Sequence, residues 1–107
     1  MDILDKFIEQ AKENVKRGYY DLSREAMPNI KRNSLKQKLL SPYFTLIAEI
    51  KHASPAGEYS FDDVDVRKLA FKFKEAGADA ISVVVEPKIF KGRLDNVAIA
   101  KKTGLPV

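Results

Sequence analysis

The sequence predicts an α/β fold built from consecutive parallel βα units. Two short apolar runs, residues 45–51 and 80–85, have the length and composition of strands. Each run is followed by a segment with the apolar spacing of a helix, so the order is strand, helix, strand, helix. Because parallel strands need crossover connections, this order favours a parallel sheet covered by helices. In that architecture, charged residues at the carboxyl end of a strand lie where ligands bind.

The first helix is expected over about residues 3–17. Asp2 can cap its start, and Gly18 suits the position just after its end. We expect its apolar stripe to pack against another part of the protein, as amphipathic helices do. The residues of the stripe recur with helical spacing: Ile3, Leu4, Phe7, Ile8, Ala11 and Val15.

A second, short helix is expected over residues 35–40. Ser34 offers an N-cap, and the Ser41-Pro42 pair ends the segment because the residue before proline avoids helical geometry. The first strand, about residues 45–51, follows directly.

The third helix is expected to begin after Asp65, a plausible N-cap, and to end at Gly77. Residues 80–85 are rich in β-branched side chains and read as a strand buried on both faces. A fourth helix fits residues 93–102, and Gly104 then turns the chain into 105–107, the opening of a third strand. The third helix places these apolar residues on one face: Val66, Leu69, Ala70, Phe73 and Ala76.

Composition excludes several classes of protein. A chain of 107 residues with 45% hydrophobic content can form one small domain. No segment approaches ~18 consecutive apolar residues, so no membrane span is expected. The amino terminus lacks the pattern of a secretory signal, and the sequence holds no cysteine and one histidine. We therefore expect a cytoplasmic protein without disulfides or a metal cluster.

The charge balance is mildly basic. The net charge is +4, from 19 Lys and Arg against 15 Asp and Glu, and a mild positive field suits an enzyme for anionic small molecules. Nucleic-acid binding is a weaker expectation, because a local cluster of basic residues is more often a solvated helix face. The densest basic cluster comprises Lys31, Arg32, Lys36 and Lys38.

Glu49 and Lys51 are the strongest candidates for chemistry. Alternation along the first strand places both side chains on one face, opposite Ile50, and the Ser54-Pro55 turn follows. The pattern alone also fits a half-solvated antiparallel strand whose charged residues simply face water. The succession of βα units favours a site instead.

Four segments together carry the resemblance to a known family: Ile47-Ala48-Glu49-Ile50-Lys51-His52-Ala53-Ser54-Pro55, Glu75-Ala76-Gly77-Ala78-Asp79-Ala80-Ile81-Ser82-Val83, Glu86-Pro87-Lys88-Ile89-Phe90-Lys91-Gly92 and Gly104-Leu105-Pro106-Val107. They resemble the indole-3-glycerol phosphate synthase family, the ring-closing enzymes of the tryptophan pathway. The resemblance implies a TIM (β/α)8 barrel, with residues 1–44 as a helical extension ahead of the barrel. Residues 45–107 would then be an incomplete portion of the barrel, its first two βα units and the start of strand three.

The sequence departs from the family pattern at four places. His52 stands where the family usually has Lys or Arg, and Ala56 replaces a hydroxyl residue. Val85 and Ile89 stand in for threonine and tyrosine. Alternation points His52 to the face opposite Lys51, and we assign it no role.

The family's reaction closes an indole ring on 1-(2-carboxyphenylamino)-1-deoxyribulose 5-phosphate, with loss of carbon dioxide and water, and it needs no cofactor. By resemblance, Glu49 acts as a base or anchors a catalytic ammonium. Lys51 is a cation for the substrate carboxylate and a proton donor, unless it only pairs with Glu49. Ser54 either caps the loop or binds substrate, and Pro55 both fixes the turn and offers a flat wall to the aromatic ring. Phe90 either stacks on that ring or packs internally.

The family's strand-three lysine, strand-four carboxylate and phosphate-binding loops would follow Val107. We therefore expect an amino-terminal portion that turns over nothing alone and needs a complementing carboxy-terminal barrel portion. Two alternatives stay open. One is another phosphate-binding barrel enzyme of the sugar-phosphate isomerase type, and the other is a non-catalytic, RNA-binding fragment that uses the basic cluster.

Overall fold

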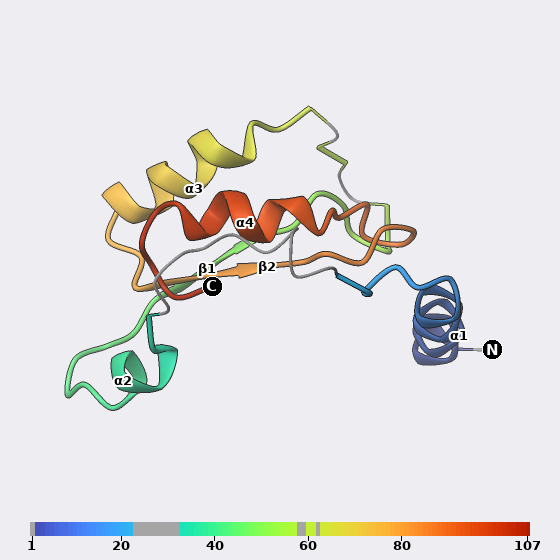
Figure 1. Cartoon of the computed structure of the whole chain (residues 1–107), viewed down its shortest axis with the longest axis horizontal. Coiled ribbons are helices and arrows are strands. Elements are labelled where there is room, and N and C mark those ends of the chain that lie inside the picture. The colour runs from blue at the N-terminus through green and yellow to red at the C-terminus, as the bar shows by residue number, and fades with distance from the viewer. Residues whose placement is uncertain (1, 23–32, 58–59, 62) are drawn as a thin grey trace.

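A computed structural model of the chain describes residues 2–22, 33–57, 60–61 and 63–107 (Figure 1). The helices and strands follow one another in the predicted order. Their bounds are α1 Ile3–Lys16, α2 Leu35–Leu39, β1 Ile47–Ile50, α3 Val66–Glu75, β2 Ala80–Val83 and α4 Asp95–Lys101. None of the helices in these described ranges is long and apolar enough to cross a membrane.

Three helices begin at the predicted caps. The side chains of Asp2 and Asp5 each accept the other's backbone N–H, which makes a capping box at the start of α1. Ser34 and Asp65 each accept a backbone N–H of the first turn of α2 and α3. Helix α4 follows Leu94 without a side-chain cap, and it begins two residues later than predicted.

The two strands pair in parallel, as predicted. Ile47 lies opposite Ala80 and Ile50 lies opposite Val83 in the register. Helices α3 and α4 lie together on one side of this two-stranded sheet in Figure 1. The buried core between them comprises Ile50, Val66, Ala70, Ile81 and Ala100. Parallel pairing removes the alternative of an antiparallel strand that merely faces water.

The second strand is not buried along its whole length. Ala80 and Ile81 are buried, but Ser82 and Val83 are half-buried, so the prediction of burial on both faces is wrong there. The physical reason is that α3 and α4 form a layer on one face only. Both strands are also shorter than predicted, since only four residues of each pair with the other.

The end of the chain runs beside β2 without forming a strand. The carbonyl oxygen of Pro106 accepts the N–H of Ile81 at 2.9 Å, but residues 105–107 belong to no strand of the described chain. Of the predicted third strand, the structure therefore shows only this one hydrogen bond to β2.

Helix α1 lies beyond the carboxyl ends of the strands, whereas α2 lies near their amino ends (Figure 1). The prediction that the apolar stripe of α1 packs is wrong for five of its six residues, because helical periodicity defines a stripe but supplies no surface to cover it. Phe7 is half-buried. Ala11 is exposed, and the larger residues that remain about half or more exposed are Ile3, Leu4, Ile8 and Val15.

Candidate functional site

Glu49 and Lys51 lie together at the carboxyl end of β1. The Nζ atom of Lys51 is 3.9 Å from Oε1 of Glu49, and their side chains are 34% and 48% exposed. Ile50, between them in sequence, is buried in the core on the other face. The structure thus brings the two predicted side chains to one face of a parallel strand. An exposed ion pair of this kind contributes about 0–1 kcal/mol to stability, so the fold does not depend on it.

Ser82 completes this group, and sequence reasoning missed it. Its hydroxyl donates to Oε2 of Glu49 at 3.0 Å from the neighbouring strand. The signal was available, because the parallel register places Glu49 opposite Ser82, the one polar residue of that apolar run. The arrangement holds one carboxylate oxygen by a hydroxyl and leaves the other beside an ammonium. Such a pair can accept a proton, donate one and attract an anion.

Ser54 closes the turn that follows. Its Oγ accepts the N–H of Ala56 at 3.3 Å, and its carbonyl oxygen accepts the N–H of Gly57 at 3.0 Å. Gly57 has φ +73°, a left-handed conformation that glycine adopts without strain. These contacts support the interpretation of Ser54 as a loop cap, while binding to a substrate stays a prediction.

Pro55 lies on the rim of a cavity of about 490 Å³ beneath α1. The proline is exposed, as expected of a residue that offers a wall to a ligand. Its contact with an aromatic ring stays a prediction. The other lining residues are Ile89 from the loop after β2 and, from α1, Ile3, Lys6, Phe7, Glu9, Gln10 and Glu13.

Phe90 packs against α1. The ring centroids of Phe90 and Phe7 are 5.7 Å apart with the planes tilted by 42°, a favourable aromatic arrangement. The interpretation of Phe90 as a packing residue is supported by this contact. Stacking on a substrate ring stays a prediction, and the two roles can coexist because a ring has two faces.

Glu86, which sequence reasoning did not single out, organises the loop after β2. Its Oε1 accepts from Asn14 Nδ2 at 2.9 Å and from the N–H of Lys88 at 2.9 Å. Its Oε2 accepts the N–H groups of Ile89 at 2.6 Å and Phe90 at 3.0 Å. Burial alone would raise the pKa of Glu86, but these four hydrogen bonds outweigh it and lower the pKa below the usual value.

One further contact holds the α1 region on this loop, and hydrogen bonds within the α1 region orient Asn14. The Tyr19 hydroxyl donates to the carbonyl oxygen of Val85 at 2.7 Å, and burial is the main cause that raises the pKa of Tyr19. Asn14 is fully buried, and its Oδ1 accepts from Gln10 at 3.0 Å and from Arg17 at 3.1 Å. No local pattern could reveal the pairing of Asn14 with the loop, because 72 residues separate it from Glu86.

His52 is buried and fully hydrogen-bonded. Its Nδ1 lies 2.8 Å from the carbonyl oxygen of Phe61, and its Nε2 lies 3.0 Å from Nδ2 of Asn96. A carbonyl only accepts, so Nδ1 carries the hydrogen and Nε2 accepts from Asn96. The N–H of Phe61 donates a hydrogen bond to the carbonyl oxygen of His52 at 2.7 Å. His52 therefore anchors the loop after β1 to α4.

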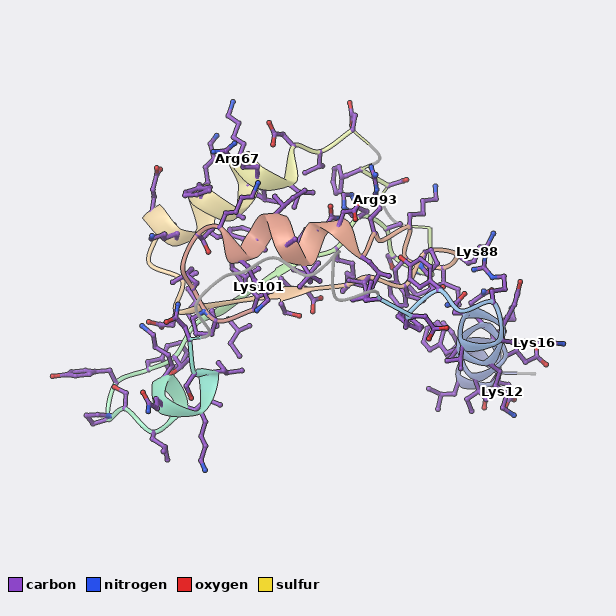
Figure 2. The ribbon with its side chains drawn as sticks, in the orientation of Figure 1. Lys12, Lys16, Arg67, Lys88, Arg93 and Lys101 are labelled. Carbon is purple, nitrogen blue, oxygen red and sulfur yellow. The ribbon has the colours of Figure 1, made fainter. Side chains whose placement is uncertain are left out.

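Two other kinds of site receive no new support. Within the described ranges, no group of three or more His, Cys, Asp or Glu side chains could hold a metal ion. Lys31 and Arg32 lie outside the described residues, while Lys36 and Lys38 are exposed on α2, so nucleic-acid binding stays a prediction. Figure 2 shows six labelled cationic side chains spread from α1 to α3 and α4: Lys12, Lys16, Arg67, Lys88, Arg93 and Lys101.

Comparison with known proteins agrees with the motif. A family model described as indole-3-glycerol phosphate synthase matches residues 3–106. A protein of that name from Campylobacter fetus subsp. fetus is 34% identical over 98% of this chain and 43% of its own length. One from Bacillus cereus (strain ATCC 10987 / NRS 248) is 38% identical over 94% of this chain and 38% of its own length. One from Exiguobacterium sibiricum is 36% identical over all of this chain and 42% of its own length. The chain spans about two-fifths of the length of these curated relatives.

Proposed function

Because the chain belongs to the indole-3-glycerol phosphate synthase family, we propose that the whole protein is a carbon–carbon lyase of tryptophan biosynthesis. Its substrate would be 1-(2-carboxyphenylamino)-1-deoxyribulose 5-phosphate, an aromatic carboxylate joined to a sugar phosphate. The parallel βα units of this chain would be the first units of a (β/α)8 barrel, and the residues before β1 its helical extension. The products would be indole-3-glycerol phosphate, carbon dioxide and water.

The observation that carries this proposal is the pairing of Glu49 with Lys51 at the carboxyl end of a parallel strand. Ligands of barrel enzymes bind at this end of the strands. No contact among the described residues favours a sugar-phosphate isomerase or an RNA-binding fragment instead. The geometry and the family assignment therefore support the same site.

Each residue of the pair has a distinct task in the proposed reaction. An aromatic carbon attacks the ketone carbon, the carboxylate leaves as carbon dioxide, and the former ketone oxygen leaves as water after protonation. The Lys51 ammonium attracts the substrate carboxylate and can donate a proton. Glu49 accepts a proton or holds an ammonium in place, and Ser82 orients its carboxylate. A positioned general acid or base typically contributes about 10²–10⁴-fold to the rate.

The aromatic part of the substrate would lie between the two loops that follow β1 and β2. Pro55 lines the cavity beneath α1, and Phe90 reaches the same region through its contact with Phe7. A proline ring and a phenyl ring present flat apolar surfaces, which suit an anthranilate ring. Ser54 would hold the first of these loops in shape.

Ring closure can be measured by the fluorescence of the indole product. The protein to test is a fusion of residues 1–107 with the part of the Campylobacter fetus relative that lies outside its match, here called the completed protein. We expect turnover by the completed protein and none by either part alone. A completed protein that is folded but shows no ring closure would overturn the proposal, as would equal turnover by the relative's part alone.

Two substitutions in the completed protein test the roles of the pair. We expect Lys51→Met and Glu49→Gln each to lower kcat/KM by about 10²–10⁴-fold. Lys72→Gln is the matched control, because Lys72 is exposed on α3 and should leave the activity unchanged. Activity within a few-fold of the unsubstituted protein in Lys51→Met would exclude this residue from the chemistry.

A further inference from the structure

We infer that Glu86 is a positioning residue for the proposed ring closure, whose carboxylate fixes Phe90 at the rim of the site and joins the Phe90 loop to α1. The inference rests on the proposed function, since Phe90 is the side chain that would contact the aromatic ring of the substrate. Glu86 itself would touch neither the substrate nor the reacting atoms.

The carboxylate of Glu86 fixes the path of a loop that contains no helix or strand. Residues 84–92 belong to no helix or strand, so no ladder of backbone hydrogen bonds fixes their path. Instead, three consecutive N–H groups, those of residues 88–90, point at one carboxylate at 2.6–3.0 Å. Successive backbone N–H groups that converge in this way form a nest that binds an anion. Hydrogen bonds to a charged acceptor are about twice as strong as neutral ones, so this contact dominates the loop.

The backbone of Phe90 is a direct member of this nest. Its N–H is 3.0 Å from Oε2 of Glu86, so the carboxylate fixes the backbone atom that precedes the phenyl side chain. The loop also closes at its far end, because Gly92 N–H donates to the carbonyl oxygen of Glu86 at 2.8 Å. Between these two points, Lys91 takes the left-handed φ of 55°. A loop held at both ends and bent in this way presents Phe90 in one direction.

Helix α1 contacts both ends of this arrangement. Asn14 donates to Glu86 and is fully buried, while Phe7 packs on Phe90. Positions seven apart lie on one face of a helix, so a single face of α1 contacts the anchor and the side chain that the anchor positions. Loss of the carboxylate would therefore remove the Asn14 contact between α1 and the loop as well as release Phe90 from its place.

A double-mutant cycle in the completed protein tests the inference. The variants are Glu86→Gln, Phe90→Ala and the two combined, with Glu75→Gln, at an exposed position of α3, as the control of the same chemical change. Glutamine turns one acceptor oxygen into an NH₂ group that faces backbone N–H donors. We expect Glu86→Gln to lower kcat/KM by about 10- to 100-fold, mainly through KM. In the Phe90→Ala background, the same change should have no further effect beyond about twofold, and Glu75→Gln should have none in either background.

If the double variant loses kcat/KM by the product of the two single losses, the inference is overturned, because Glu86 would then act independently of Phe90. Hydrogen exchange of the N–H groups of residues 88–90 gives a second measure, and unchanged protection in Glu86→Gln would also overturn it. Should Glu86→Gln fail to fold, Glu86→Asp takes its place in the cycle, since its shorter side chain keeps the charge but withdraws the carboxylate from the three backbone N–H groups. Absence of ring closure in the unsubstituted completed protein would instead defeat the proposed function, and the inference with it.

Discussion

Gly92→Ala is expected to destabilise the loop after β2, because a Cβ atom at this position has no room. The added atom would lie 2.3 Å from the carbonyl oxygen of Val84 and 2.8 Å from the Cα and C atoms of Val85. Ordinary contact begins at 3.4 Å, and these neighbours are backbone atoms that cannot rotate away. Any movement of Gly92 also strains its hydrogen bond to the carbonyl oxygen of Glu86.

The size of the effect follows from these two losses. Overpacking of a buried position typically costs about 1–3 kcal/mol. The weakened hydrogen bond adds about 1 kcal/mol. We therefore expect Gly92→Ala to lower the free energy of unfolding of the completed protein by about 2–4 kcal/mol. With a urea dependence of about 2 kcal/mol/M, the middle of the typical range, the unfolding midpoint would fall by about 1–2 M, which circular dichroism can follow.

Gly57→Ala is the matched control, because it separates backbone conformation from steric overlap. Gly57 has φ +73° and nothing within 4 Å of an added Cβ, so alanine there meets only the left-handed penalty of about 1–2 kcal/mol. Gly92 does not have a left-handed φ, and its penalty is steric. A Gly92→Ala protein that unfolds at the unsubstituted midpoint would refute this reasoning, as would a larger loss in Gly57→Ala.

Three further predictions concern hydrogen bonds. Since its hydrogen bonds hold the pKa of Glu86 below the usual 4.5, its contribution to stability is complete above pH 4.5 and is lost as the pH falls through the lowered pKa. The free energy of unfolding, measured from above pH 4.5 down through the lowered pKa, should therefore depend less on pH in Glu86→Gln. An unchanged pH profile would contradict the lowered pKa of Glu86. Asn96→Ala should lower the free energy of unfolding by about 1–3 kcal/mol, because it leaves Nε2 of buried His52 without a donor; a neutral result would mean that His52 finds another partner. Asp65→Ala should lower the free energy of unfolding by about 1 kcal/mol, because the cap on Lys68 N–H is lost. Asp65→Asn should retain most of the stability that this cap contributes.

The sequence was sufficient for the features that depend on neighbouring residues. Asp2, Ser34 and Asp65 cap helices as predicted, since capping needs only a side chain and an N–H two or three residues away. Alternation likewise placed Glu49 and Lys51 on one face before any strand pairing was known. These signals are local, so a single sequence contains them.

Features that depend on distant parts of the chain could not be predicted in this way. The pairing of Asn14 with Glu86 joins residues 72 apart, and His52 meets Asn96 across 44 residues. A buried polar side chain looks the same in sequence as a solvated one. The burial of β2 was overestimated for a related reason, because a β-branched run shows that a strand is apolar without showing what covers each face.

The two parts of the proposed site depend on different contacts, so a fall in pH should affect the loop that carries Phe90 and leave the strands paired. Glu49 and Lys51 share a face because they flank Ile50 in β1, a strand that is held to β2 by backbone hydrogen bonds without a titratable member. Phe90 depends on the ionised carboxylate of Glu86, which loses its charge as the pH falls through its lowered pKa, below the usual 4.5. Moderate acid would therefore release the loop while the strands remain paired. In the completed protein, KM for the aromatic substrate should rise in acid as the loop is released, and Glu86→Gln should remove that part of the pH dependence. The same rise in KM in Glu86→Gln would assign the acid sensitivity to the substrate or to another group.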